Sequence, residues 1–200
     1  MKNLFYLLLI ILLGGLLLYL GKGILSFQEQ EIADLEDKIA LLKSQHTPIK
    51  FKVTEKTAEK ISFSMAFFDA DGQKISSENF SLNGKELMFD FYLIKVRDRY
   101  VAFPYKVFTD EIAPDNGTLL FSYYDKDNFP QIFFSKNMDL ELKKLLTILF
   151  EKSKSGEIEK EETYFGNVVH DIAGIKEFKQ GYVYKIVSFS AGGMEVTEDM

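Results

Sequence analysis

An unbroken run of apolar residues, Leu4–Leu20, is the strongest feature in the pattern of hydrophobic and polar positions along the chain. A helix rises about 1.5 Å per residue, so this run would span roughly 25 Å, close to the thickness of a bilayer core. Extended through Ile24 and Leu25, it predicts a transmembrane helix over residues 4–25, with the Lys22 amine reaching the headgroups. We therefore expect a single-pass membrane protein.

A cleaved secretory signal peptide is the alternative, with Lys2 ahead of the apolar run. Such peptides have shorter apolar stretches that end in a small-residue cleavage pattern, which residues 20–25 lack. We expect the run to be retained as a signal anchor. Lysines near its ends are almost balanced, and the short tail of residues 1–3 is easily kept in the cytoplasm. The main domain is then extracytoplasmic, on the periplasmic or cell-surface side.

A short helical stalk is expected over residues 26–47, because apolar residues follow the a and d positions of a heptad repeat. These a and d residues are Ile32, Leu35, Ile39 and Leu42. The charged residues at e and g positions are Glu31, Glu36, Lys38 and Lys43. In a parallel homodimer, like charges would face each other, so a coiled coil would favour a different membrane protein as partner. The alternative is an unpaired helix that is solvated or leans on its own domain.

Residues 48–190 predict a β-rich domain, with alternating apolar and polar positions at 51–53 and 61–68. Asn83-Gly84, between two strand-like runs, predicts a hairpin with a type I′ turn. The run that follows, Leu87–Ile94, is apolar on most of both faces, so we expect a strand that is central or covered by a helix.

Further strands are expected at 100–108, broken by Pro104, at 118–124 and 131–135, and within 164–190, where 182–189 has the clearest strand pattern. One amphipathic helix is expected over 138–152, with Asn137 as N-cap and Gly156 beyond its end. Residues 191–200 are expected to form a flexible tail. The predicted fold class is therefore mainly β (α+β): an anchor and stalk, then an antiparallel β-sandwich-like domain with one packed helix.

Composition supports a β-rich core and excludes some functions. The chain has 19 Phe and 10 Tyr but no Trp, and aromatic residues favour strands. A net charge of −6 with two arginines, Arg97 and Arg99, argues against binding nucleic acid. The chain has no cysteine and two histidines, so a zinc site would need mostly carboxylates. We expect no cofactor.

Two aspartate pairs could hold a cation: Asp69 with Asp71, and Asp125 with Asp127. Neither has the spacing of a calcium-binding loop, so ordinary turns are favoured, and a joint cation site stays an open alternative. His170-Asp171 could be half of an acid–base pair. No nucleophile motif accompanies it, so we expect no enzymatic activity.

A group of aromatic residues could line a groove for an apolar or peptide ligand, although such residues more often form ordinary β core. The candidate groove residues are Phe103, Tyr105, Phe108, Tyr123, Tyr124 and Phe129. If they line a groove, an apolar ligand would bind inside the β domain.

The arrangement of anchor, stalk and β domain resembles that of bitopic scaffolds in bacterial envelope assemblies. The resemblance implies a non-enzymatic scaffold or accessory subunit that acts through its stalk and β-rich domain. The alternative is a membrane-tethered carrier of a lipid or other apolar ligand, an arrangement that resembles jellyroll-type lipid-transport components. An anchored hydrolase is the third possibility.

Overall fold

The structure is a computed structural model, and it describes residues 45–96, 99–157, 164–167 and 178–199. The predicted transmembrane helix and residues 26–44 of the predicted stalk lie outside these ranges. Within the described ranges, no helix combines the length and the hydropathy needed to cross a membrane.

The first sheet is antiparallel, and its strands follow the order β11-β10-β1-β2-β3. Its strands are β1 (Gln45–Lys56), β2 (Lys60–Phe68), β3 (Lys74–Asn83), β10 (Val183–Phe189) and β11 (Met194–Glu198). Alternation in β2 confirms the predicted pattern, since Ile61, Phe63, Met65 and Phe67 are buried while the residues between them are partly exposed.

The second sheet is also antiparallel and follows the order β6-β5-β4-β9. Its strands are β4 (Leu87–Val96), β5 (Arg99–Thr109), β6 (Thr118–Leu119) and β9 (Tyr164–Asn167). A small hairpin joins β7 (Asp125–Lys126) and β8 (Phe129–Pro130). The helical elements are α2 (Leu140–Ser155) and the 3₁₀ turns η1 (Pro114–Asn116), η2 (Phe121–Tyr123) and η3 (Gln131–Phe133).

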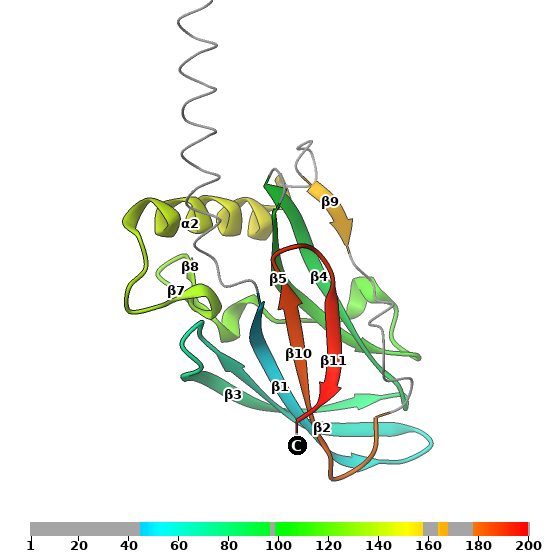
Figure 1. The fold of residues 1–200 in the computed structure, drawn as a ribbon. Helices are drawn as coiled ribbons and strands as arrows, with labels where there is room; N and C mark the ends of the chain where they lie inside the picture. Colours follow the sequence, from blue (N-terminus) through cyan, green and yellow to red (C-terminus); the bar gives the residue numbers. More distant parts are fainter. Residues whose placement is uncertain (1–44, 97–98, 158–163, 168–177, 200) are drawn as a thin grey trace, which may run out of the picture. The chain divides into compact units, whose positions relative to one another are not determined.

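The two sheets pack face to face, and α2 lies against the second sheet (Figure 1). Phe51 of the first sheet meets Phe89 of the second with ring centroids 5.1 Å apart. Phe103 of β5 points to the opposite face and meets Phe150 of α2 at 5.4 Å. The prediction of a mainly β domain with antiparallel sheets and one packed α-helix is confirmed for the described residues.

Strand β4 is an interior strand, as its apolar pattern predicts. It lies between β5 and β9. Phe89 and Phe91 face the first sheet and are 1 % exposed, while Tyr92 and Ile94 on the other face are 2 % and 0 % exposed. Burial of both faces is possible because the first sheet covers one and the helical elements cover the other.

The predicted Asn83-Gly84 hairpin is wrong, because β3 and β4 belong to different sheets. Gly84 does have positive φ (103°), but Asn83 does not, so the link is no type I′ turn. Its residues are held by Asp110, whose carboxylate accepts from the Lys85 and Glu86 amides at 2.8 and 3.0 Å. Strand β4 is buried on both faces and lies in the interior of the second sheet. Strand β3 is polar on its outer face and lies at the edge of the first sheet.

The type I′ geometry lies elsewhere, in the β7–β8 hairpin. Asp127 and Asn128 both have positive φ, 56° and 63°, between the paired residues Lys126 and Phe129. Lys154 of α2 contacts both ends of this turn, at 2.6 Å from the Asp125 carboxylate and 2.7 Å from the Asn128 amide oxygen. The hairpin is thereby fixed to α2.

Both ends of the predicted domain need correction. Strand β1 begins at Gln45, so residues 45–47 are strand rather than the end of the helical stalk. Gln45 and His46 pair with β10, and the register shifts between His46 and Ile49. The described part of the predicted flexible tail, residues 191–199, is ordered, since Met194–Glu198 forms β11 on β10. Gly192 and Gly193, with φ of 101° and 95°, turn the chain back, and Val196 packs into the core.

Three local predictions also change. Helix α2 starts at Leu140 because Asp139, not Asn137, is the N-cap, accepting from the Glu141 and Leu142 amides. Gly156 ends it in the left-handed conformation, as predicted. Of 118–124 only Thr118–Leu119 is strand and Phe121–Tyr123 is a 3₁₀ turn, while in 131–135 Gln131–Phe133 is a 3₁₀ turn instead of a strand. Strand β5 continues through Pro104, which is accommodated where its pairing with β4 shifts register.

Candidate functional site

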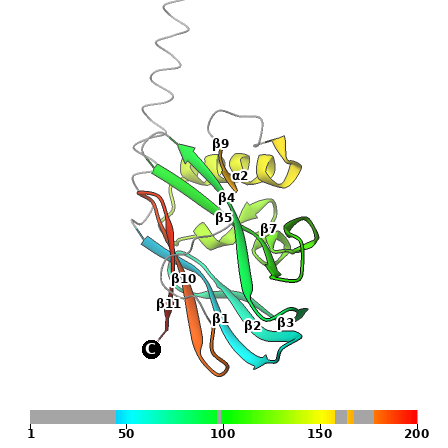
Figure 2. The ribbon, with the colours of Figure 1, turned by 90° about the vertical axis from the view of Figure 1, so that its right-hand side faces the viewer.

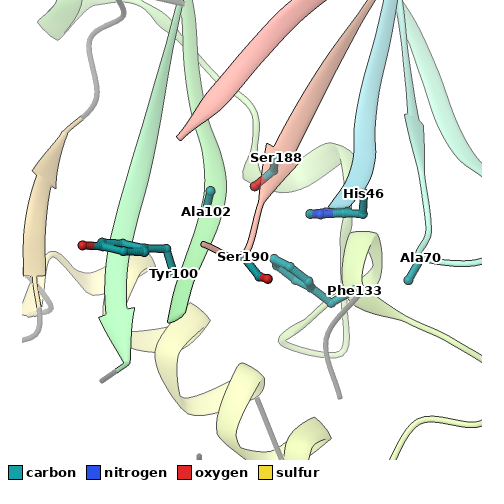
Figure 3. Close-up of a pocket in the computed structure, with 7 residues that line it drawn as sticks. All are labelled: His46, Ala70, Tyr100, Ala102, Phe133, Ser188 and Ser190. Atoms are coloured by element: carbon teal, nitrogen blue, oxygen red, sulfur yellow. The ribbon is translucent and has the colours of Figure 1, made fainter. Parts of the chain in front are cut away.

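A small pocket lies between the sheets at the end of the domain where β1 begins (Figure 3). It is lined by His46, Ala70, Tyr100, Ala102, Phe133, Ser188 and Ser190. The pocket therefore gathers β1, the β2–β3 turn, β5, η3 and the end of β10. In Figure 3 the His46 imidazole points toward the two serines, and the Tyr100 ring extends away from it.

Small side chains create this pocket. Ala102 takes the core-facing position on β5, and Ser188 and Ser190 continue the core-facing side of β10 beyond Ile186. Toward the middle of the sandwich, the core-facing positions of the strands hold larger residues such as Ile186. The space inside the pocket is about 20 Å³, enough for one water molecule and too small for a lipid chain or a metabolite.

Hydrogen bonds and ring contacts fix the walls of the pocket. Arg99 donates to Ser190 Oγ at 2.9 Å, and the Tyr100 amide donates to the Ser190 carbonyl at 2.9 Å. The His46 ring lies against Phe133, with centroids 5.0 Å apart. Since Ser190 Oγ accepts from a guanidinium, it is not held as a nucleophile by a base, which serine catalysis would need. The pocket suits a small polar occupant such as water.

A wider cleft of about 390 Å³ opens beside the pocket and shares His46 with it. Its lining residues are Gln45, His46, Thr47, Asp69, Ala70, Asp71 and Gly72. Asp69 Oδ1 accepts from the Asp71 and Gln73 amides at 3.0 and 2.7 Å, and Asp71 Oδ2 accepts from the Lys136 amide. The Asp69 carboxylate thus stabilises the β2–β3 turn itself, and the Asp71 carboxylate holds this turn against the segment after η3.

The predicted cation alternative gains no support from these turns. Asp69 and Asp71 are engaged with backbone amides, and Asp125 forms an ion pair with Lys154 at 2.6 Å. In the part of the chain that the structure describes, no three His, Cys, Asp or Glu residues are grouped to hold a metal ion. The two turns lie on different elements, one before β3 and one between β7 and β8.

The candidate groove residues lie in and around the core. Phe103, Phe108, Tyr124 and Phe129 are at most 3 % exposed, and Tyr105 and Tyr123 are partly buried against the core. Tyr124 donates its hydroxyl to the Pro104 carbonyl at 2.6 Å. Burial, with the Asp125 charge nearby, raises the pKa of Tyr124 well above its ordinary value. Four of the six residues therefore present no surface to a ligand.

The remaining candidates lie outside the described residues. These are the stalk residues Ile32, Leu35, Ile39, Leu42, Glu31, Glu36, Lys38 and Lys43, together with His170 and Asp171.

Sequence reasoning missed the pocket because it assigned His46 to the end of the stalk. The register pairs His46 with Ser188 across β1 and β10. One signal was present: Tyr184, Ile186, Ser188 and Ser190 alternate along one face, so small polar residues replace large apolar ones toward the strand's end.

Comparison of the chain with protein-family models, with curated proteins and with solved structures finds no match. The function therefore has to be inferred from the sequence and the structure of this chain.

Proposed function

We propose that this chain is a membrane-tethered, non-enzymatic scaffold or accessory subunit of a bacterial envelope complex, and that it acts by binding other proteins. The apolar run Leu4–Leu20 supports the tether. In this proposal the anchor is retained and the β-rich domain lies outside the cytoplasm. Amino-terminal sequencing of native material tests the tether: a mature start between residues 20 and 30 contradicts it.

The filled interior of the domain is the observation that favours a scaffold over a lipid carrier. Phe51 alone packs against the rings of Phe63, Phe89, Phe178 and Tyr184, at centroid distances of 5.1 to 6.5 Å. A ligand site usually encloses several hundred Å³. The pocket beside His46 holds about 20 Å³, and the larger cleft beside it is open to solvent, with a lining that is about half polar.

The stalk supplies the first proposed contact with a partner. Its acidic positions Glu31 and Glu36 precede its basic positions Lys38 and Lys43. A partner helix with basic residues near the membrane and acidic residues farther out would complement this order. We propose such a membrane protein as the partner of the stalk.

Crosslinking in native membranes tests the function. A photoreactive amino acid is placed at an exposed position, Tyr182, and at a stalk position, Leu35, and the crosslinked species are identified by mass spectrometry. A scaffold gives the same few membrane proteins from repeated preparations. Crosslinks to lipid from core positions such as Phe91 would favour the carrier, and an absence of protein partners at every position would contradict the scaffold.

A further inference from the structure

The two edges of the first sheet differ in how the rest of the domain covers them. At the β3 edge, Ser76 donates to the Tyr123 carbonyl at 2.5 Å and Thr109 donates to the Asn83 carbonyl, so the second sheet and η2 cover both ends of the strand. At the other edge, β11 pairs with β10, and no described strand pairs with its far side. Figure 2 shows β11 at the margin of the sheet.

The backbone groups that β11 directs away from β10 follow from the ladder. Phe189 donates to the Gly193 carbonyl and Asp199 donates to the Val183 carbonyl, which makes 189/193 and 183/199 hydrogen-bonded pairs. Such pairs alternate along an antiparallel ladder. The amides and carbonyls of Met194, Val196 and Glu198 therefore point outward, three residues in one extended row.

This edge has no proline, lysine or β-bulge. Proteins use these features, together with short edge strands and other charged residues, to prevent unwanted pairing at edges, and of this set β11 has only its short length and two glutamates. Residues 194–198 read Met-Glu-Val-Thr-Glu, and their pairing with β10 runs without a register shift. The strand is regular and open to a further strand, although it is short.

The side chains of β11 indicate the chemistry of that further strand. Met194 and Val196 face the core, so a neighbouring strand with apolar residues at the matching positions would extend the core. The charges of β11 itself are Glu195 and Glu198, and neither has an ion pair in the described part of the chain. The next residue, Asp199, is already neutralised by Lys50 at 2.6 Å and Lys185 at 3.6 Å.

We infer that β11 is a docking edge for an extended segment of a partner protein in which apolar residues alternate with lysine or arginine. The segment adds as a sixth strand of the first sheet. Apolar residues of the segment lie beside Met194 and Val196 on the core face, and a basic residue lies beside Glu195 on the opposite face. A second copy of this chain fits poorly, because pairing β11 with itself brings four glutamates onto two adjacent strands. The inference rests on the proposed scaffold function, since it names the surface and the partner chemistry.

Amide exchange on the full-length chain in a neutral detergent tests the edge directly. The probe is a capped ten-residue peptide of alternating Val and Lys, and its control is the same peptide with Glu in place of Lys. Binding should slow exchange of the Met194, Val196 and Glu198 amides by at least tenfold. The Glu195 and Thr197 amides already bond to β10 and should change little. The Val/Glu peptide should protect none of them.

Charge reversal supplies the second arm. The E195K variant should bind the Val/Lys peptide about threefold more weakly, because a lysine then faces the peptide's lysine, and it should bind the Val/Glu peptide more tightly than the native chain does. The matched control reverses one exposed glutamate elsewhere, E111K, and should behave like the native chain. Circular dichroism confirms that both variants are folded. Protection outside β11, equal protection by both peptides, or no effect of E195K would overturn the inference.

Crosslinking separates this inference from the proposed function. If a photoreactive residue in place of Glu198 captures the same native membrane protein as those at Tyr182 and Leu35, the docking edge and the scaffold function are both supported. If proteins are captured at Tyr182 or Leu35 but never at Glu198, the scaffold function is supported and the proposed docking edge is wrong. If the peptide protects β11 but native membranes yield no partner, the edge stands and the scaffold is wrong.

Discussion

The middle of the sandwich and its His46 end are built from the same strands but are filled differently. In the middle, Phe51 and Phe89 close the space between the sheets. Toward the start of β1, Ala102 and Ser188 replace such residues and leave a small pocket. The contrast indicates that the middle supplies the stability of the domain, whereas the His46 end tolerates change.

Removing an aromatic ring from the middle should have the largest effect. Phe51→Ala deletes a side chain that is 1 % exposed and contacts four other rings. We expect a loss of about 3–5 kcal/mol in the free energy of unfolding, because the surrounding sheets cannot collapse into the cavity. Denaturant melts of the full-length chain in detergent measure it. A loss below about 1 kcal/mol would mean that the middle is not the stabilising region.

A side chain at Gly84 should be the next most costly change. Its φ is 103°, and an added Cβ would lie 2.6 Å from Thr109 Oγ1 and 2.7 Å from Asp110 Oδ1. We expect Gly84→Val to cost on the order of 1–3 kcal/mol from backbone strain alone, with the steric clash adding to it. Gly72→Val is the control, because Gly72 also has positive φ (79°) but an added Cβ would meet nothing within 4 Å. Equal losses in the two variants would contradict the close packing at Gly84.

Enlarging a buried side chain should cost more stability in the middle of the sandwich than at its His46 end. Val53→Ile enlarges a side chain that is 0 % exposed in the filled middle, and we expect it to cost about 1–3 kcal/mol. Ala102→Val adds atoms beside the pocket at the His46 end, and we expect a change below about 1 kcal/mol. Unfolding midpoints of the two variants provide the comparison. A larger loss for Ala102→Val would show that the pocket is closely packed.

The smallest expected effect is the pH dependence at Asp110. Amide donation, from Glu86 and then from Lys85, lowers the pKa of the Asp110 carboxyl in the folded chain. A lowered folded pKa adds stability above the unfolded pKa, near 3.9, and this stability is lost as the pH falls through the folded pKa. Asp110→Asn should therefore lower the unfolding midpoint at pH 7 and have less effect near pH 2. An equal effect at both pH values would exclude a charge contribution.

The fold was predictable where side-chain alternation decides it. The burial of Ile61, Phe63, Met65 and Phe67 follows from period-two alternation, and the interior position of β4 follows from its two apolar faces. The hairpin predicted from Asn83-Gly84 was wrong, because a turn motif specifies a local bend and does not specify which sheet the next strand joins.

The pocket could not be predicted because it depends on register. His46, Ala102 and Ser188 are distant in the sequence, and strand pairing and sheet packing bring them together. The C-terminal strand was missed for a related reason. Gly192 and Gly193 suggest a loose segment, whereas β10 supplies the ladder that orders Met194–Glu198.

Native mass spectrometry of the full-length chain, released from its own membrane in mild detergent, tests the central claim most directly. The account predicts a species that contains the intact 23.0 kDa chain, with Leu4–Leu20 retained, bound to another protein and free of stoichiometric lipid. A chain that begins after residue 20, or a chain that carries one lipid and no protein partner, would contradict it.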